Sequence, residues 1–110
     1  MPLPLPAQFT TCNWDEVPET EHPGETGAAF WKTQQYDGVR VRIVRYTPGY
    51  LADHWCKRGH VLFVMSGSLE TEVEGQESVT LHAGMSYAVA DDASSHRSRT
   101  ATGATLFIVD

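Results

Sequence analysis

The chain has 110 residues, 41% apolar and 20% charged, which is typical of one globular domain rather than of a disordered chain. Its formal charge of -6 and its eight scattered lysines and arginines argue against a nucleic-acid-binding face, which needs clustered basic residues. The sequence shows no secretion signal and no membrane span, so we expect a cytoplasmic protein.

The N-terminal quarter of the sequence predicts little regular structure. Residues 1–10 read MPLPLPAQFT, and three prolines exclude a helix interior or a central strand, so we expect an extended arm. Residues 13–27 are rich in acids, proline and glycine, which predicts an irregular loop. We therefore divide the chain into an arm and loop over 1–30 and a single domain over 31–110.

Short apolar segments separated by turns follow, and they predict strands. The expected strands cover residues 28–36, 39–46, 60–67, 68–75, 77–84, 85–90 and 104–110. In VRVRIVRY, Val41 and Ile43 alternate with Arg40 and Arg42 and should face the opposite side of the sheet. No segment has convincing helical periodicity, so we expect an all-β sandwich or barrel.

The two cysteines are Cys12 and Cys56. Thiols stay reduced in the cytoplasm, so we expect Cys56 to be available as a thiol or thiolate. The alternative is a disulfide between the two.

The segment DHWCKRGH places His54, Cys56 and His60 within seven positions. On a strand, His54 and Cys56 would point to the same face, and Gly59 allows a bend before His60. Imidazole and thiolate suit zinc, nickel, copper and ferrous iron, so donors converging inside a barrel would bind such a metal. The alternative is a packed strand with a hydrogen-bonded histidine and a small buried cysteine.

A fourth donor would strengthen the metal interpretation, and His22, His82 and His96 are the candidates. His22 either reaches over the barrel mouth or lies in a solvated turn, and His82 should be exposed. Asp53 can support a ligand imidazole, although strand alternation would point it away from His54. Tyr87 is expected in the core or an interface, and Arg97 either pairs with an anionic substrate or lies exposed on a strand.

These residues resemble the first cupin motif, G-x5-H-x-H-x3-E-x6-G. Gly49, His54, Cys56, His60 and Gly67 occupy its positions, with Gly49 one residue too close, cysteine in place of the second histidine and histidine in place of glutamate.

The second cupin motif, G…P-x-G-x2-H-x3-N, is matched more loosely. Gly84 and His96 correspond, whereas Ala90, Asp92 and Thr100 replace its proline, glycine and asparagine. With ADHWC…GHVLFV, EHPGETG and GMSYAVAD…HRS, the chain resembles the DHCW-motif cupin group from about Thr11 onward.

The resemblance implies a cupin-type conserved β-barrel (jelly roll) with an extended N-terminal arm. It implies that His54, Cys56, His60 and His96 bind one divalent transition metal. Thiolate ligation favours zinc or nickel, whereas a site of three histidines without Cys56 would suit iron. A homodimer is also expected, because the arm and the exposed sheet edges would then be covered.

Three functions fit these expectations. The barrel could be a metal-dependent enzyme acting on a small molecule inside it, of unresolved reaction type. It could instead bind or sense a small molecule or a metal without catalysis, as closed four-ligand sites often do. In the third, the metal only stabilises the fold.

Overall fold

The predicted all-β fold is confirmed. The computed structural model describes residues 3–110, which contain a short 3-10 helix, η1 (Trp14–Glu16), and eight strands. The strands are β1 (Thr20–Pro23), β2 (Ala28–Tyr36), β3 (Val39–Tyr46), β4 (His60–Val73), β5 (Val79–His82), β6 (Ser86–Val89), β7 (His96–Arg99) and β8 (Ala104–Val109). Within the described residues, no helix is long and apolar enough to cross a membrane.

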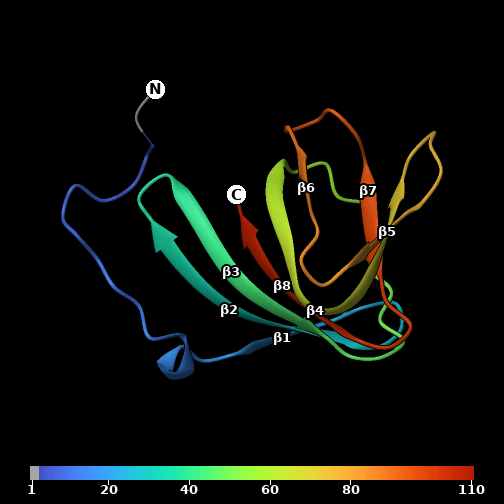
Figure 1. Ribbon diagram of the computed structural model, residues 1–110, viewed down its shortest axis with the longest axis horizontal. Helices are drawn as coiled ribbons and strands as arrows, with labels where there is room; N and C mark the ends of the chain where they lie inside the picture. The colour runs from blue at the N-terminus through green and yellow to red at the C-terminus, as the bar shows by residue number, and fades with distance from the viewer. Residues whose placement is uncertain (1–2) are drawn as a thin grey trace.

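The strands pair antiparallel in the order β1-β2-β3-β8-β4-β5, and β6 and β7 also pair with β4. The first part of β4 pairs with β8 and β6, and its last part pairs with β5 and β7. Figure 1 shows β1, β2, β3 and β8 as one layer, β5, β6 and β7 on the opposite side, and β4 running between them. This long strand therefore joins the two layers of the barrel.

β4 replaces the two strands predicted at 60–67 and 68–75. The register of its pairing with β8 shifts just before Gly67, whose φ of +77° lies in the left-handed region that favours glycine. A Cβ on Gly67 would overlap the carbonyl oxygen of Gly103. The glycine does not end the strand, because a bulge bends the backbone while pairing continues on both sides.

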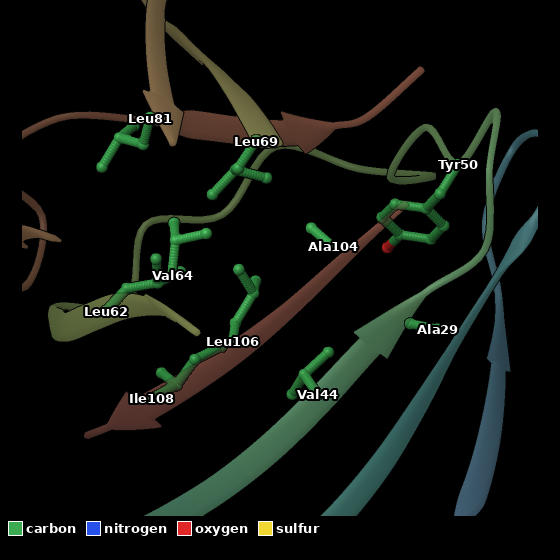
Figure 2. Packing of buried hydrophobic residues seen from close by; sticks show 10 residues of the cluster. All are labelled: Ala29, Val44, Tyr50, Leu62, Val64, Leu69, Leu81, Ala104, Leu106 and Ile108. Atoms are coloured by element: carbon green, nitrogen blue, oxygen red, sulfur yellow. The ribbon is translucent and has the colours of Figure 1, made fainter. Parts of the chain in front are cut away.

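The hydrophobic core lies between the two layers and draws most of its side chains from β4 and β8. Its buried members are Ala29, Val44, Tyr50, Leu62, Val64, Leu69, Leu81, Ala104, Leu106 and Ile108. Figure 2 shows the leucines and valines of β4, β5 and β8 pointing toward one another. Burial of each such side chain contributes roughly 1.5–3 kcal/mol relative to exposure, so alternate positions on these strands stabilise the barrel.

The predicted irregular loop over 13–27 is wrong in part, because it contains η1 and β1. Thr20 of β1 lies opposite Trp31 of β2, so the sheet begins ahead of residue 31. β1 is an edge strand that is mostly exposed, and backbone pairing with β2 forms it without the apolar alternation that signals a strand. Pro23 can end it because an edge strand needs no amide donor there.

The segment 3–12 contains neither helix nor strand, as expected for an arm. It is attached to the hairpin between β2 and β3, where the Gly38 amide donates a 3.1 Å hydrogen bond to the carbonyl of Pro4. Trp14, just beyond the arm, packs edge-on against Phe107 of β8.

The sequence does not predict β7, because its residues, HRSR, have no apolar alternation. Arg97 and Arg99 of β7 pair with Glu72 and Glu70 of β4, at 2.9 and 3.1 Å. Cross-strand ion pairs therefore accompany the backbone ladder that forms this strand. The consequence for the site is that β7 begins at His96.

Candidate functional site

One cavity of about 260 Å³ brings together the four predicted metal ligands. His54, Cys56, His60 and His96 all line it, although they come from two separate parts of the chain, residues 54–60 and 96. His60 is the first residue of β4 and His96 is the first residue of β7, whereas His54 and Cys56 lie in the connection between β3 and β4.

His60 and His96 are the two buried histidines of this cavity. Their rings lie 4.9 Å apart at 77° to each other. The His96 Nδ1–H donates a 3.0 Å hydrogen bond to the carbonyl of Ser94, which leaves Nε2 as the free nitrogen. This Nε2 is buried without a hydrogen-bond partner in the structure. A free imidazole nitrogen in this state can accept a metal ion.

His60 faces inward with Leu62 and Val64, as the alternation of β4 predicted. Its Nε2 lies 2.8 Å from the hydroxyl of Tyr87, and its Nδ1 is buried without a hydrogen-bond partner. Burial, with a further contribution from the charge on His96, lowers the pKa of His60 from 6.5 to about 4. His60 is therefore neutral at neutral pH, the state that metal ligation requires.

Tyr87 closes the cavity beside His60. It was predicted as a core or interface residue, and it is indeed partly buried. Burial raises the pKa of its hydroxyl above the ordinary value, so the phenol stays protonated at neutral pH. It therefore acts as a neutral hydrogen-bond partner of His60 rather than as a base.

Cys56 is held at the cavity by backbone pairing with His96. The amide of each residue donates to the carbonyl of the other, at 2.8 and 2.9 Å. The Cys56 Sγ accepts a 3.4 Å hydrogen bond from the amide of Arg58. Cys12 lies outside the cavity near Gln34, and both cysteines are free, so the alternative of a disulfide is wrong.

His54 is the most exposed of the four predicted ligands, with 75% of its side chain accessible. Neither His54 nor Cys56 lies in one of the strands, so the prediction of a shared strand face is wrong. Asp53 is not turned away from His54 as strand alternation predicted, and its Oδ1 lies 2.6 Å from His54 Nδ1. The irregular backbone of this connection frees both side chains from strand alternation.

The remaining histidines lie elsewhere. His22 is in β1, where its ring stacks on Trp31 at 3.7 Å and its Nε2 lies 3.0 Å from Thr20 Oγ1. It is neither at the cavity nor in a solvated turn, so both alternatives for it are wrong. His82 is exposed at the end of β5, as predicted.

The cavity residues suit a transition metal chemically, but they do not form a complete cage. Among residues 3–110, no three side chains of His, Cys, Asp or Glu lie close enough together to hold a metal ion as they stand. His60 Nδ1 and His96 Nε2, which are buried without hydrogen-bond partners, are nevertheless the atoms that a metal ion would bind. The four-ligand assignment therefore stays a prediction.

The wall of the cavity beside His60 carries an arginine cluster that the sequence did not predict. Arg40, Arg42 and Arg58 all approach Asp110, whose side chain is only 1% exposed. Burial opposes ionisation of Asp110, but hydrogen bonds from Arg40 and the charges of the arginines outweigh it and lower its pKa. The carboxylate is therefore ionised and bound at neutral pH.

Arg42 is the most buried of these arginines, with 8% of its side chain exposed. It lies 4.4 Å over the ring of Trp31 and donates a 3.0 Å hydrogen bond to Asp110 Oδ2. Val41 does face away from Arg40 and Arg42, as predicted, but the arginine face is the one that looks into the cavity. Val41 is buried on the other face near the N-terminal arm, so apolar alternation did not reveal which side was the interior.

Arg97 also lines the cavity. It matches neither predicted alternative, because it is not a free cation for a substrate and it is not fully exposed. Its Nη2 pairs with Glu72 at 2.9 Å, and its guanidinium lies 5.0 Å over Trp55. Its charge is therefore already compensated by a carboxylate of the same barrel wall.

Comparisons with known proteins give the fold. No protein-family model and no curated protein matches the sequence. Among solved structures, a predicted oxalate decarboxylase from Thermotoga maritima matches with a TM-score of 0.77 and 14% identity, over 91% of this chain and 96% of that one. A cupin-like protein from the same organism matches with a TM-score of 0.70 and 19% identity, over 86% and 76%.

A third solved structure, described as Fe(II)-HppE with an alternative substrate, matches with a TM-score of 0.77 and 15% identity. The match covers 96% of this chain and 62% of that one. Sequence identities this low establish the shared architecture and nothing more. The chain has the cupin-type β-barrel fold, and residues of that barrel line its cavity.

Proposed function

We propose that this protein is a metal-binding cupin of the DHCW-motif group and a metal-dependent enzyme acting on a small molecule in its cavity. The observation that carries the proposal is the pair of buried imidazoles, His60 and His96, each with an unpartnered nitrogen at a cavity that Cys56 also lines. Buried polar atoms are rarely left unpaired, so these two nitrogens point to a missing partner.

The donor set supports a divalent transition metal. In the proposal, His54, Cys56, His60 and His96 hold the ion, and Cys56 thiolate favours zinc or nickel. A site of histidines without the thiolate would suit iron, the metal named for the HppE neighbour. When bound, such an ion would polarise a small molecule as a Lewis acid.

The second candidate is a barrel that binds or senses a ligand without catalysis. Asp110 is the only carboxylate lining the cavity within the described residues, and it is paired with three arginines. Tyr87 is held protonated, so neither group is a free general base. Coordination separates the two candidates, because a metal that keeps an exchangeable water favours catalysis and four protein donors alone favour binding.

We also propose a cytoplasmic homodimer. The free state of both cysteines suits a reducing compartment. The outer face of β4 exposes Val61, Phe63 and Met65, at 52%, 43% and 46%, and a contiguous apolar surface of this kind suits a partner copy.

The metal site is tested by elemental analysis of protein purified without a metal-affinity column. Cys56→Ser and His96→Ala are compared with the matched controls Cys12→Ser and His82→Ala, which change the same residue types outside the cavity. About one metal per chain, retained in the controls and reduced in the two cavity variants, supports the proposal. No metal in the wild type, or equal metal in all five proteins, contradicts it.

A further inference from the structure

The cavity is positively charged although the chain as a whole carries a formal charge of -6. Three guanidinium groups, those of Arg40, Arg42 and Arg58, converge on the single carboxylate of Asp110. Within residues 3–110, no other carboxylate pairs with any of the three. The Asp110 side chain compensates one of the three positive charges, so the guanidinium groups of this wall outnumber its side-chain carboxylates, and a bound anion would balance the difference.

Arg42 shows that the excess charge is built into the barrel rather than solvated. More than nine-tenths of its side chain is buried, and its Nε has no hydrogen-bond partner. Stacking on Trp31 at 4.4 Å fixes the plane of its guanidinium. A buried cation with an unused donor is costly unless a ligand pairs with it.

Arg58 supplies a second cation on the same wall, and it is accessible. Its Nε lies 3.3 Å from Asp110 Oδ2, and 54% of its side chain is exposed. An incoming anion can therefore reach this guanidinium from solvent. Arg97 adds no free charge, because Glu72 already compensates it.

We propose that the small molecule bound in this cavity carries a carboxylate, and that Arg42 and Arg58 receive it. The inference rests on the proposed function, because it names the substrate class of the same site. Planar guanidinium groups match a carboxylate through paired N–H donors, and such charge-assisted bonds are strong where water is excluded. At about 30 Å³ per water, 260 Å³ holds roughly nine water volumes, a size that suits a small organic acid.

A metal held by the predicted ligands would act in the same direction. Three neutral imidazoles and one thiolate leave a divalent ion with net positive charge, unlike a site with several carboxylate ligands. The ion and the arginine cluster would then both attract an anion.

Isothermal titration of the full-length chain tests the inference with matched probes. Butyrate is compared with butyramide and succinate with succinamide, because each amide keeps the shape and removes the charge. Inorganic phosphate is a third arm, since arginines also bind phosphate. We expect each carboxylate to bind at least about tenfold more tightly than its amide, and more tightly than phosphate.

The variants assign this preference to the arginines. We expect Arg58→Gln and Arg42→Gln to weaken carboxylate binding about tenfold or more, and Arg58→Lys to restore part of it. Arg45→Gln is the control, since Arg45 lies on β3 with Arg42 but outside the cavity, and its side chain is 48% exposed. If circular dichroism shows that Arg42→Gln does not fold, the comparison of Arg58→Gln with Arg58→Lys tests the inference, because Arg58 is half-exposed.

Several outcomes would overturn the inference: amides binding as tightly as carboxylates, phosphate alone binding, no carboxylate binding at millimolar concentration, or Arg58→Gln binding like the wild type. The titrations are run before and after metal removal, with metal content measured separately. If the protein never contains metal but binds carboxylates through Arg58, the proposed metal-dependent function is wrong and the carboxylate inference stands. If the protein contains metal but does not prefer carboxylates to amides, the carboxylate inference is wrong and the proposed function stands.

Discussion

The guanidinium of Arg40 forms a bidentate ion pair with the carboxylate of Asp110, with Nε 2.8 Å from Oδ1 and Nη2 3.0 Å from Oδ2. The backbone amides of the two residues also exchange hydrogen bonds, at 2.7 and 2.8 Å. This pairing joins β3 to the residue that follows β8. It therefore fixes the wall of the cavity that carries the arginines.

Loss of this carboxylate should destabilise the barrel. Asp110→Asn leaves three guanidiniums around a neutral amide, and breaking a buried ion pair from one side costs about 3 kcal/mol. Urea unfolding at neutral pH measures the change in the free energy of unfolding. Asp37→Asn is the control, because Asp37 is exposed with φ +48°, a conformation that asparagine tolerates. Equal midpoints for the two variants would show that the cluster does not stabilise the fold.

Two glycines with the same backbone conformation should respond differently to alanine. Gly67 and Gly75 have φ of +77° and +76°, but a Cβ meets the backbone of Gly103 at the first position and nothing within 4 Å at the second. We expect Gly75→Ala to cost about 1 kcal/mol from left-handed strain, and Gly67→Ala about 3 kcal/mol because the β8 end must also shift. Thermal unfolding of both variants checks this ranking. Similar losses of stability in the two variants would contradict a close contact between Gly67 and the backbone of Gly103.

The stability of metal-free protein should fall in mild acid because of His60. Its native pKa is about 4, below the ordinary 6.5. As pH falls from 6.5, the unfolded chain binds a proton that the native state excludes, so the free energy of unfolding decreases until pH approaches 4.

His60→Gln removes this component of the pH dependence. Urea unfolding of chelator-treated protein across this range should give a flatter profile for His60→Gln than for the wild type. His82→Gln, at the exposed end of β5, should keep the wild-type profile. Parallel profiles for all three proteins would mean that His60 titrates normally.

The proposed homodimer should depend on the outer face of β4. Phe63→Glu places a charge on its exposed apolar surface, where we expect it to oppose association. Light scattering after size exclusion should report a dimer for the wild type and a monomer for this variant. Val79→Glu, at an exposed valine of β5, is the matched control and should stay dimeric. A monomeric wild type would end the dimer proposal.

The sequence alone determined the all-β architecture and four of the residues that line the cavity, His54, Cys56, His60 and His96. Alternation placed His60 on the inward face with Leu62, because a strand fixes side-chain direction with a period of two. The same local rule failed at His54 and Asp53, where the backbone is irregular, and at β1 and β7, which backbone pairing and ion pairs form without an apolar pattern.

Tertiary structure alone decided the charge of the cavity. Arg42 and Val41 alternate clearly in the sequence, but both are buried, one by the barrel and one near the N-terminal arm. A strand covered on both faces has no solvent side, so alternation cannot say which face is interior. The meeting of Arg40 with Asp110, seventy positions apart, depends on the pairing of β3 with β8, because only that register brings their side chains together.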